Sequence, residues 1–529
     1  MKHNFSNVPR ADIPRSSFNR THGYKTTFDA GFLVPFFVDE VLPGDTFNLK
    51  ATLFARLATP LKPFMDNMKA STFFFFVPNR LVWNNWERFN GQQDDPGDST
   101  DFLVPQMVSP GGGYSVGTLQ DYMGLPTGVA GFSHGAFWTR AYNLIWNDWF
   151  RDQNLQNSVV VDKDDGPDTP SDYVLLRRGK RHDYFTSCLP WPQKGPAVDI
   201  PFTGNAPLTP TSANVSFSGP ANTVTGGITT TNVIWSSSTG LSASTPPGAN
   251  ASQVGFNMPS ATVNLSGVTA NLSAVAAATI NSLRQAFQIQ KLYERDARGG
   301  TRYTEIVRSH FGVISPDARL QRPEYLGGGS TPVNVNPIAQ TSSTDDETPQ
   351  GNLAAMGTLN AHGHGFTKSF VEHGVVIGLV CVDADLNYQQ GLNRMWSRST
   401  RWDFYWPALS HLGEQAVLNK EIYTQGSANP TADAAVFGYQ ERFAEYRYKP
   451  SQITGQLRST YAQSLDVWHL AQEFSSLPVL NATFIQSDPP VDRVIAVPSE
   501  PHFLFDSYID LKCVRPMPVY SVPGLIDHF

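Results

Sequence analysis

The chain has 529 residues, more than one simple core usually holds, so we expect several domains or one domain with large insertions. The net charge is −7 and only 16% of residues are charged, which argues against a strongly basic nucleic-acid-binding protein. Aromatic residues reach 12%, with 42 Gly and 39 Pro, and this composition favours a β-rich protein that buries surface against copies of itself.

The three cysteines, Cys188, Cys381 and Cys513, are odd in number and far apart. We therefore expect free thiols and folding in a reducing compartment rather than a disulfide framework. We also expect no signal peptide and no membrane span, because the start of the chain lacks a long apolar stretch and no other run is long enough.

Residues 1–23 are predicted to be a basic arm. Between residues 1 and 25 five basic side chains accompany one acid, Asp12, and apolar periodicity is weak. A solvated terminus and an arm that contacts phosphates both explain this pattern. The candidate DNA-binding residues are Lys2, Arg10, Arg15, Arg20 and Lys25.

Residues 24–77 are predicted to form the first strands. An apolar run at 32–38 and a turn at 42–45 precede the segment 47–57, in which apolar residues alternate with others. A period of two indicates a strand with one buried face. The run 70–77, with four consecutive Phe, predicts a strand covered on both faces.

Residues 84–195 are predicted to be an insertion of loops with one helix at about 135–152, capped by Ser133. Aromatic side chains recur along one wide face of this helix, which must be buried in the core or at an interface. Arg140 and other polar residues occupy the opposite side. The candidate packing or interface residues are Phe137, Trp138, Tyr142, Trp146, Trp149 and Phe150.

The segment 200–283 contains no Asp, Glu, Lys or Arg. Residues 212–219 and 260–267 resemble each other, and both alternate small polar with apolar residues. A disordered linker is one interpretation. Weak β-structure, better held where copies from neighbouring subunits pack together, is the favoured one.

Helices are predicted at 275–298 and 302–311, and the segment 326–352, which holds a Gly triplet, is predicted to be a loop. A buried strand is predicted at 375–382.

Residues 386–500 are predicted to alternate short helices and loops before a final strand at 502–514. The strands near the two ends of the chain must then pair across several hundred residues. This arrangement favours one β-sandwich decorated by insertions.

Three short motifs resemble sites that carry chemistry. Ser133 lies in a G-x-S-x-G pattern, but a poor strand precedes it, so a helix N-cap is favoured over a hydrolase nucleophile. His362 and His364 in a Gly-rich segment are a weak metal signal and favour a loop. The acidic run 162–168 departs from the EF-hand register, and low-affinity calcium binding stays open. We predict no metal, no cofactor and no enzymatic activity.

Longer strings resemble the major capsid proteins of the gokushoviruses, a branch of the Microviridae. The resemblance runs in the expected order along almost the whole chain. The strings are PRADIPRS at 9–16, RAYNLIWNDWFRDQN at 140–154, KRHDYFTSCLPWPQKG at 180–195, LRQAF at 283–287, RSHFGV at 308–313, RLQRPEYLGG at 319–328 and YQERFAEYR at 439–447.

The resemblance implies a mainly β fold, an eight-stranded viral jelly roll within residues 24–529, with long insertions that contain helices. It implies a structural protein of a T=1 icosahedral shell around circular single-stranded DNA, with segment 200–283 as a three-fold protrusion for host attachment. A β-rich surface adhesin or carbohydrate-binding protein is the alternative.

The partners implied by the resemblance are further copies of the chain in pentamers, the single-stranded DNA genome, a small basic DNA-binding protein, a scaffolding protein and a host surface receptor. The implied location is the virion, after assembly in the cytoplasm of a bacterial host.

Overall fold

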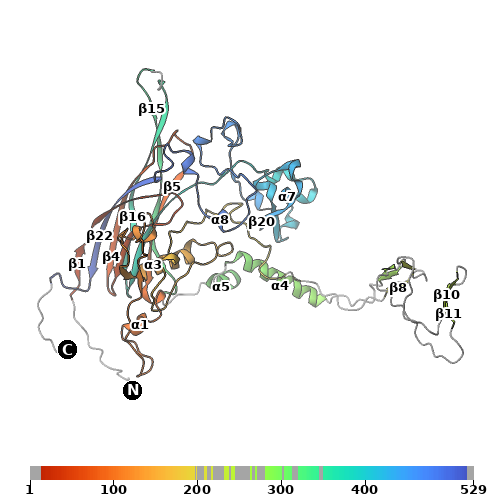
Figure 1. Cartoon of the computed structure of the whole chain (residues 1–529), viewed down its shortest axis with the longest axis horizontal. Helices are drawn as coiled ribbons and strands as arrows, with labels where there is room; N and C mark the ends of the chain where they lie inside the picture. Colours follow the sequence, from red (N-terminus) through yellow and green to blue (C-terminus); the bar gives the residue numbers. More distant parts are fainter. Residues whose placement is uncertain are drawn as a thin grey trace. The chain divides into compact units, whose positions relative to one another are not determined.

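The computed structural model of the chain describes residues 14–196, 198, several short strands between 208 and 270, 280–300, 303–312, 320–344 and 349–520. The chain divides into two compact units, one of residues 1–195 and 293–529 and the other of residues 196–292. Figure 1 shows the chain with its elements labelled.

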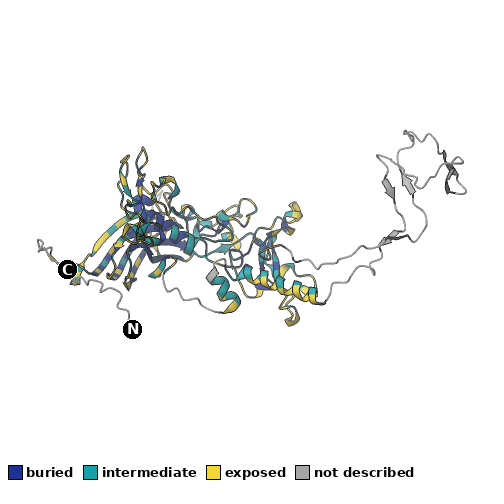
Figure 2. Cartoon of the chain, turned by 90° about the horizontal axis from the view of Figure 1, so that it is seen from below, coloured by how far each residue is buried: buried dark blue, intermediate teal, exposed yellow. Residues whose placement is uncertain are grey.

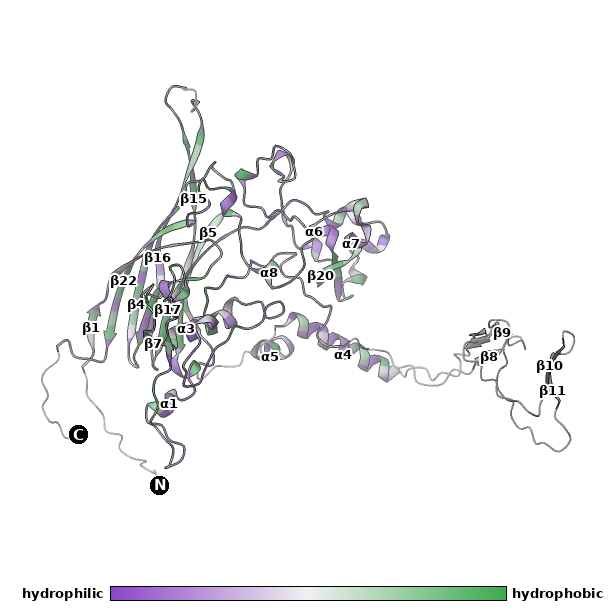
Figure 3. Cartoon of the chain, in the orientation of Figure 1, coloured by the Kyte–Doolittle hydropathy of each residue, from purple (hydrophilic) through white to green (hydrophobic). Residues whose placement is uncertain are grey.

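The first sheet of the larger unit brings together strands from both ends of the chain. Its strands are β1 (Ser16–Asn19), β2 (His22–Phe28), β4 (Thr46–Leu57), β15 (Asn334–Ala339), β16 (Leu353–Ser369) and β22 (Phe503–Arg515). β1 and β2 pair in turn with β22, and the order continues through β4, β16 and β15, all antiparallel. The alternation of hydrophobic and hydrophilic residues along β4 and β22 can be followed in Figure 3.

The second sheet has the order β14-β5-β17-β3, also antiparallel. Its strands are β3 (Val34–Val41), β5 (Met68–Pro78), β14 (Glu324–Pro332) and β17 (Gly374–Ala384). Two sets of four, β2-β22-β4-β16 and β14-β5-β17-β3, make the eight strands of a jelly roll. The predicted fold class and the pairing of the last strand with the early ones are confirmed.

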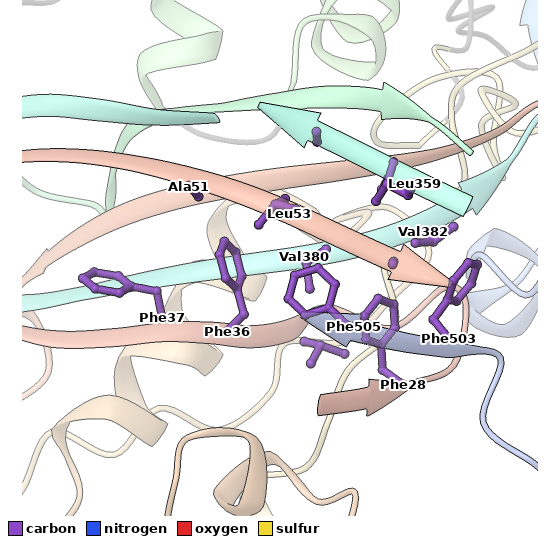
Figure 4. Packing of buried hydrophobic residues seen from close by; sticks show 14 of the residues in the cluster. Phe28, Phe36, Phe37, Ala51, Leu53, Leu359, Val380, Val382, Phe503 and Phe505 are labelled. Carbon is purple, nitrogen blue, oxygen red and sulfur yellow. The ribbon is translucent and has the colours of Figure 1, made fainter. Parts of the chain in front are cut away.

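The main core lies between the two sheets. Figure 4 shows Phe36, Val380 and Phe505 among the packed side chains. The rings of Phe36 and Phe505 meet edge to face with their centroids 5.9 Å apart. Such aromatic pairs add to the free energy gained by removing apolar area from water. Figure 2 shows that buried residues concentrate in these strands.

The two central strands of the second sheet, β5 and β17, are buried on both faces, as predicted from their continuous apolar runs. On β5, Phe74 and Phe76 face the main core, whereas Phe75 and Val77 pack in a second cluster with the aromatic helix. That helix is α3 (Phe137–Ile145), which continues as a π-helical turn at Trp146–Phe150.

The long connection from β5 to β14 contains the predicted 84–195 insertion. Its first part holds α1 (Trp86–Phe89), β6 (Gln106–Val108), α2 (Leu119–Tyr122), β7 (Ser133–Gly135) and α3. The predicted helix is confirmed, but Ser133 as its N-cap is wrong. Ser133 lies in β7, paired with β6, and Ala136 occupies the N-cap position without a side-chain hydrogen bond.

The connection from β17 to β22 is the predicted region of short helices and loops. A hairpin of two strands holds part of it together. Its elements are β18 (Asn387–Tyr388), β19 (Glu414–Leu418), α6 (Asn419–Ile422), α7 (Pro430–Ala434), β20 (Val436–Glu441), β21 (Ser451–Gln452) and α8 (Ala482–Ile485), with 3₁₀ turns between them.

The predicted loop at 326–352 is wrong over its first half, where β14 and β15 occupy residues 326–332 and 334–339. The Gly triplet does not form a turn. A Cβ atom on Gly328 would lie 2.0 Å from the carbonyl oxygen of Thr72, and one on Gly329 would lie 2.5 Å from the ring of His364. These glycines therefore allow close strand packing next to a β-bulge between Tyr325 and Gly327.

The smaller unit contains the charge-free segment. Its described strands are β8 (Leu208–Pro210), β9 (Ser216–Ser218), β10 (Asn232–Ser236), β11 (Gly240–Ser244), β12 (Thr262–Asn264) and β13 (Val268–Ala270). They pair in a nested antiparallel series, β8 with β13, β9 with β12 and β10 with β11. The two internally similar segments thus contribute strands that pair with each other, β9 and β12.

Two helices follow in the chain, α4 (Ile280–Arg298) and α5 (Tyr303–Phe311). Both helices were predicted, although residues 275–279 of the first prediction lie outside the described residues.

Candidate assembly surface

The aromatic residues predicted from the helix divide between core and surface. Phe137, Tyr142 and Trp146 are buried in the second cluster, with Trp138 and Phe150 partly buried against it. Tyr142 and Trp146 also donate hydrogen bonds to the carbonyl oxygens of Leu33 and Arg177, at 2.9 Å each. Only Trp149 is classed as exposed. Most of this face therefore packs inside the subunit.

Arg140, predicted on the polar side of the helix, is fully buried. Its Nε lies 2.8 Å from Oδ2 of Asp168, and its Nη1 donates to the carbonyl oxygens of Val82 and Asp164, at 2.9 Å each. Tyr173 donates to the same Asp168 carboxylate at 2.7 Å. Burial and this carboxylate raise the pKa of Tyr173 well above its ordinary value.

This network occupies the acidic run that suggested a calcium loop. Asp165 accepts hydrogen bonds from Trp83 and Asn85, at 2.7 and 2.9 Å. The run therefore anchors the helix to the loops around it. Among the described residues no cluster of three or more His, Cys, Asp or Glu side chains is arranged to hold a metal ion.

The histidines of the Gly-rich segment lie in β16, not in the predicted loop. The β-bulge between Ala361 and His364 turns His364 inward, where its two ring nitrogens lie 2.9 and 3.0 Å from the hydroxyls of Thr72 and Thr331. Burial lowers the pKa of His364. His362 remains exposed.

Ser133 has no catalytic partner in the described part of the chain. Its hydroxyl donates to Oε1 of Gln106 at 3.0 Å, and the neighbouring His134 contacts the hydroxyl of Tyr114 through Nε2 at 2.8 Å. This arrangement lacks the serine–histidine hydrogen bond that a hydrolase requires.

The basic residues predicted to contact DNA are in part tied to the jelly roll. Arg15 donates to the carbonyl oxygen of Gly44 at 2.6 Å, Arg20 pairs with Asp39 at 2.5 Å, and Lys25 pairs with Asp506 at 2.7 Å. The predicted arm boundary at residue 23 needs correction, because β1 begins at Ser16. Lys2 and Arg10 lie outside the described residues.

Among the described residues, a surface rich in exposed aromatic side chains lies between β18 and β19 and just after β20, and it was not predicted from the sequence. We call it the tryptophan–arginine patch. Its large aromatic side chains are between 42% and 72% exposed: Trp396, Trp402, Phe404, Tyr405, Trp406, Tyr446 and Tyr448. The dense spacing of Trp, Tyr and Arg at 394–406 was the signal that could have revealed it.

Arginines are interleaved with the rings of this patch. The guanidinium of Arg401 lies 4.6 Å from the ring centroid of Trp406, and that of Arg398 lies 4.3 Å from that of Tyr446. Asp403 accepts hydrogen bonds from the backbone of Ser399 and Thr400, and these hold its pKa at about 2. These contacts therefore hold the loop in one conformation before any partner binds.

Large exposed apolar patches mark interaction sites, and Trp, Tyr and Arg are the residues enriched at the energetic centres of protein interfaces. The family model for "Capsid protein (F protein)" matches residues 6–525. The chain belongs to this phage capsid protein family. The jelly roll is thus a coat-protein subunit, a component of the virion that assembles into an oligomeric shell.

Three relatives named "Capsid protein VP1" agree with this assignment. The chain is 50% identical to the protein of Bdellovibrio phage phiMH2K over 100% of its own length and 98% of the relative's. It is 47% identical to the protein of Chlamydia phage 1, over 99% of the chain and 98% of the relative. It is 36% identical to that of Spiroplasma virus 4, over 99% and 97%.

The family assignment covers the charge-free segment as well, so a surface adhesin is not needed to explain it. Within the described residues of this capsid protein, no helix has the length and apolar character needed to cross a bilayer.

Proposed function

We propose that copies of this capsid protein assemble, through pentamers, into a T=1 icosahedral shell that encloses circular single-stranded DNA, and that the chain has no enzymatic role. The observation that carries the self-association is the tryptophan–arginine patch, because so much exposed aromatic surface is costly for a subunit that stays alone. Closed symmetry requires each subunit to offer such surfaces to its neighbours.

The domain arrangement in this proposal is a short basic arm, one jelly roll and three insertions, at 84–195, 200–283 and 386–500. The proposed partners are the DNA genome, a small basic DNA-binding protein and a scaffolding protein, with assembly in the cytoplasm of the bacterial host. The arm, with Lys2 and Arg10, is proposed to meet the genome, because its charge is opposite to that of phosphate.

The charge-free segment is proposed to form a protrusion at the three-fold axis that contacts a receptor on the host. Two features support this role: the absence of charged residues from 200–283, and a nested series of short strands, which are weakly stable alone and would gain from contacts with neighbouring copies.

The test of self-association replaces Trp402 and Trp406 with Ala in a phage that supplies all other assembly proteins. Each central aromatic residue of an interface contributes on the order of 2 kcal/mol or more, so we expect loss of full shells in sedimentation and electron microscopy. The unassembled subunit should keep the thermal stability of the wild type, because both side chains are exposed.

The matched control is Leu103→Ala, which shortens an apolar side chain that is 82% exposed and lies outside the patch. It should leave shell yield unchanged. Normal shells at normal yield from the Trp402→Ala, Trp406→Ala variant would contradict the assignment of the patch to subunit contacts.

A further inference from the structure

A second surface of the jelly-roll unit combines positive charge with aromatic rings. It is a groove of about 390 Å³ at the end of the aromatic helix, which we call the basic groove. Its walls come from β5, from the π-helical turn, from residues 178–182 and from β14. Four arginine and lysine side chains line it, together with His182, against one lining carboxylate, Asp152.

The cations of the groove are held in place by contacts beneath it. Arg178 and Arg181 both pair with Asp383, whose side chain is only 5% exposed, at 3.3 and 3.1 Å, and Arg181 also lies 3.7 Å from Asp385. The ammonium of Lys180 donates to Gln472 at 2.8 Å and lies 4.4 Å from the ring centroid of Phe484. Because four basic side chains line the groove against Asp152, with Asp383 and Asp385 beneath them, the groove keeps a positive excess in a chain whose net charge is −7.

Two rings are presented beside these cations. Trp149 is 39% and Tyr325 is 43% exposed, with their ring centroids 6.2 Å apart. The indole of Trp149 is fixed by a 2.9 Å hydrogen bond to the carbonyl oxygen of Pro323, and the guanidinium of Arg322 lies 5.1 Å from its ring centroid. Their positions are therefore set before any ligand arrives.

We propose that the basic groove binds single-stranded nucleic acid, with Trp149 and Tyr325 stacking on a base and Arg181 and its neighbours facing the adjoining phosphates. Sequence-tolerant binding of single strands uses this pairing of a positive groove with aromatic platforms. The volume lies in the range of about 300–1,000 Å³ that accommodates one small ligand, which suits a single nucleotide unit. This inference deepens the proposed function, since it rests on a genome of single-stranded DNA.

An acidic peptide is the other ligand that the charge would accept. Nucleic acid is favoured because carboxylates make no use of two exposed rings, whereas a base stacks on such rings. A basic partner protein is disfavoured by like charge.

The test measures binding of a fluorescent oligothymidylate of about 16 nucleotides, a length that spans one binding site, to the full-length chain. Tyr325→Leu removes a stacking ring and should weaken binding at least about fivefold without changing its salt dependence. Arg181→Gln removes one phosphate contact and should also reduce the slope of log K against log salt by roughly 0.7.

The matched control is Arg88→Gln, since Arg88 is a half-exposed arginine paired with an aspartate, Asp94, and does not line the groove. It should bind the oligonucleotide like the wild type. Equal binding by the wild type and both groove variants would overturn the proposal. So would a poly-glutamate peptide that binds as tightly as the oligonucleotide and loses its binding in the same variants.

Shell formation by the same variants is scored separately by electron microscopy. Full-sized shells with less DNA from Tyr325→Leu would support the groove. Shells with normal DNA content would overturn the groove and leave the proposed function standing. Absence of shells from the wild-type chain in the complete phage would refute the proposed function, while the oligonucleotide measurement would still decide the groove.

Discussion

The guanidinium of Arg140 is completely buried, and its Nε lies 2.8 Å from Oδ2 of Asp168. Both residues lie in the 84–195 insertion, one in α3 and the other in the acidic run 28 positions later, so the pair fastens this run to the helix that covers the second sheet. A buried ion pair of this kind gains little when complete and costs much when broken, because the remaining charge loses both its partner and water.

We therefore expect Arg140→Met or Asp168→Asn alone to destabilise the subunit by about 3–5 kcal/mol. The double variant should be less destabilised than the sum of the two. Urea unfolding followed by tryptophan fluorescence measures these differences. Arg88→Met, at the exposed 3.7 Å pair with Asp94, is the control and should cost about 1 kcal/mol or less. Additive effects of Arg140→Met and Asp168→Asn would show that the pair is not coupled.

Gly328→Ala tests the close packing of β14 on β5. The new methyl carbon would lie 2.0 Å from the backbone oxygen of Thr72, which cannot move without breaking the strand pairing. We expect a loss of at least about 1–3 kcal/mol of stability, measured as a lower melting temperature. Gly97→Ala, where nothing lies within 4 Å, should leave it nearly unchanged. Equal melting temperatures for the two variants would refute this account.

Lys180 should make stability depend on alkaline pH. Burial lowers its pKa from 10.5 to about 8, so between these values the unfolded chain holds a proton that the folded chain does not. Stability from this group therefore rises as the pH increases from about 8 to 10.5, by about 3 kcal/mol at most. Lys180→Met should lack this rise relative to the wild type, whereas Lys25→Met, at a 75% exposed side chain, should keep it. If the free energy of unfolding changed with pH in the same way in the wild type and in Lys180→Met, Lys180 would not cause the predicted rise.

His364 should make stability depend on acidic pH. Burial lowers its pKa below 6.5, so the folded state resists the proton that the unfolded chain takes up. Its contribution is present above about pH 6.5 and declines as the pH falls toward the lowered pKa. His364→Gln should flatten this decline in chemical unfolding at pH 5–6.5, and the exposed His362→Gln should not. If the stability of His364→Gln declined between pH 6.5 and 5 as steeply as that of the wild type, this role would be contradicted.

The sequence predicted the strands well, because the pattern of apolar residues along a strand directly follows which of its faces is buried. The alternation at 47–57 and the apolar run at 375–382 directly reflect which faces of β4 and β17 are buried. The same reasoning failed for the Gly triplet at 327–329 and for His364. In both cases glycine serves a close approach or a bulge between strands, which composition alone does not distinguish from a loop.

The candidate surfaces were harder to predict, because each depends on residues distant in the sequence. The basic groove brings together Phe73, Trp149, Arg181 and Tyr325. The charge of Arg140 is neutralised by Asp168, which lies 28 positions later and outside the helix, so the helical pattern could not predict the pair. The helix pattern indicated that an aromatic face must be buried, but not that most of it packs within the subunit.

By itself, the sequence determined the β-rich class, the need for the last strand to pair with the first ones, and the relationship to phage capsid proteins, since these depend on periodicity and on long matching strings. Only the tertiary structure decided which of the many aromatic residues remain at the surface. Exposure is a property of packing between distant segments: Phe137 is covered by Trp83 and Trp86, whereas Trp402 and Trp406 stay 60% and 42% exposed beside Arg401 of their own loop.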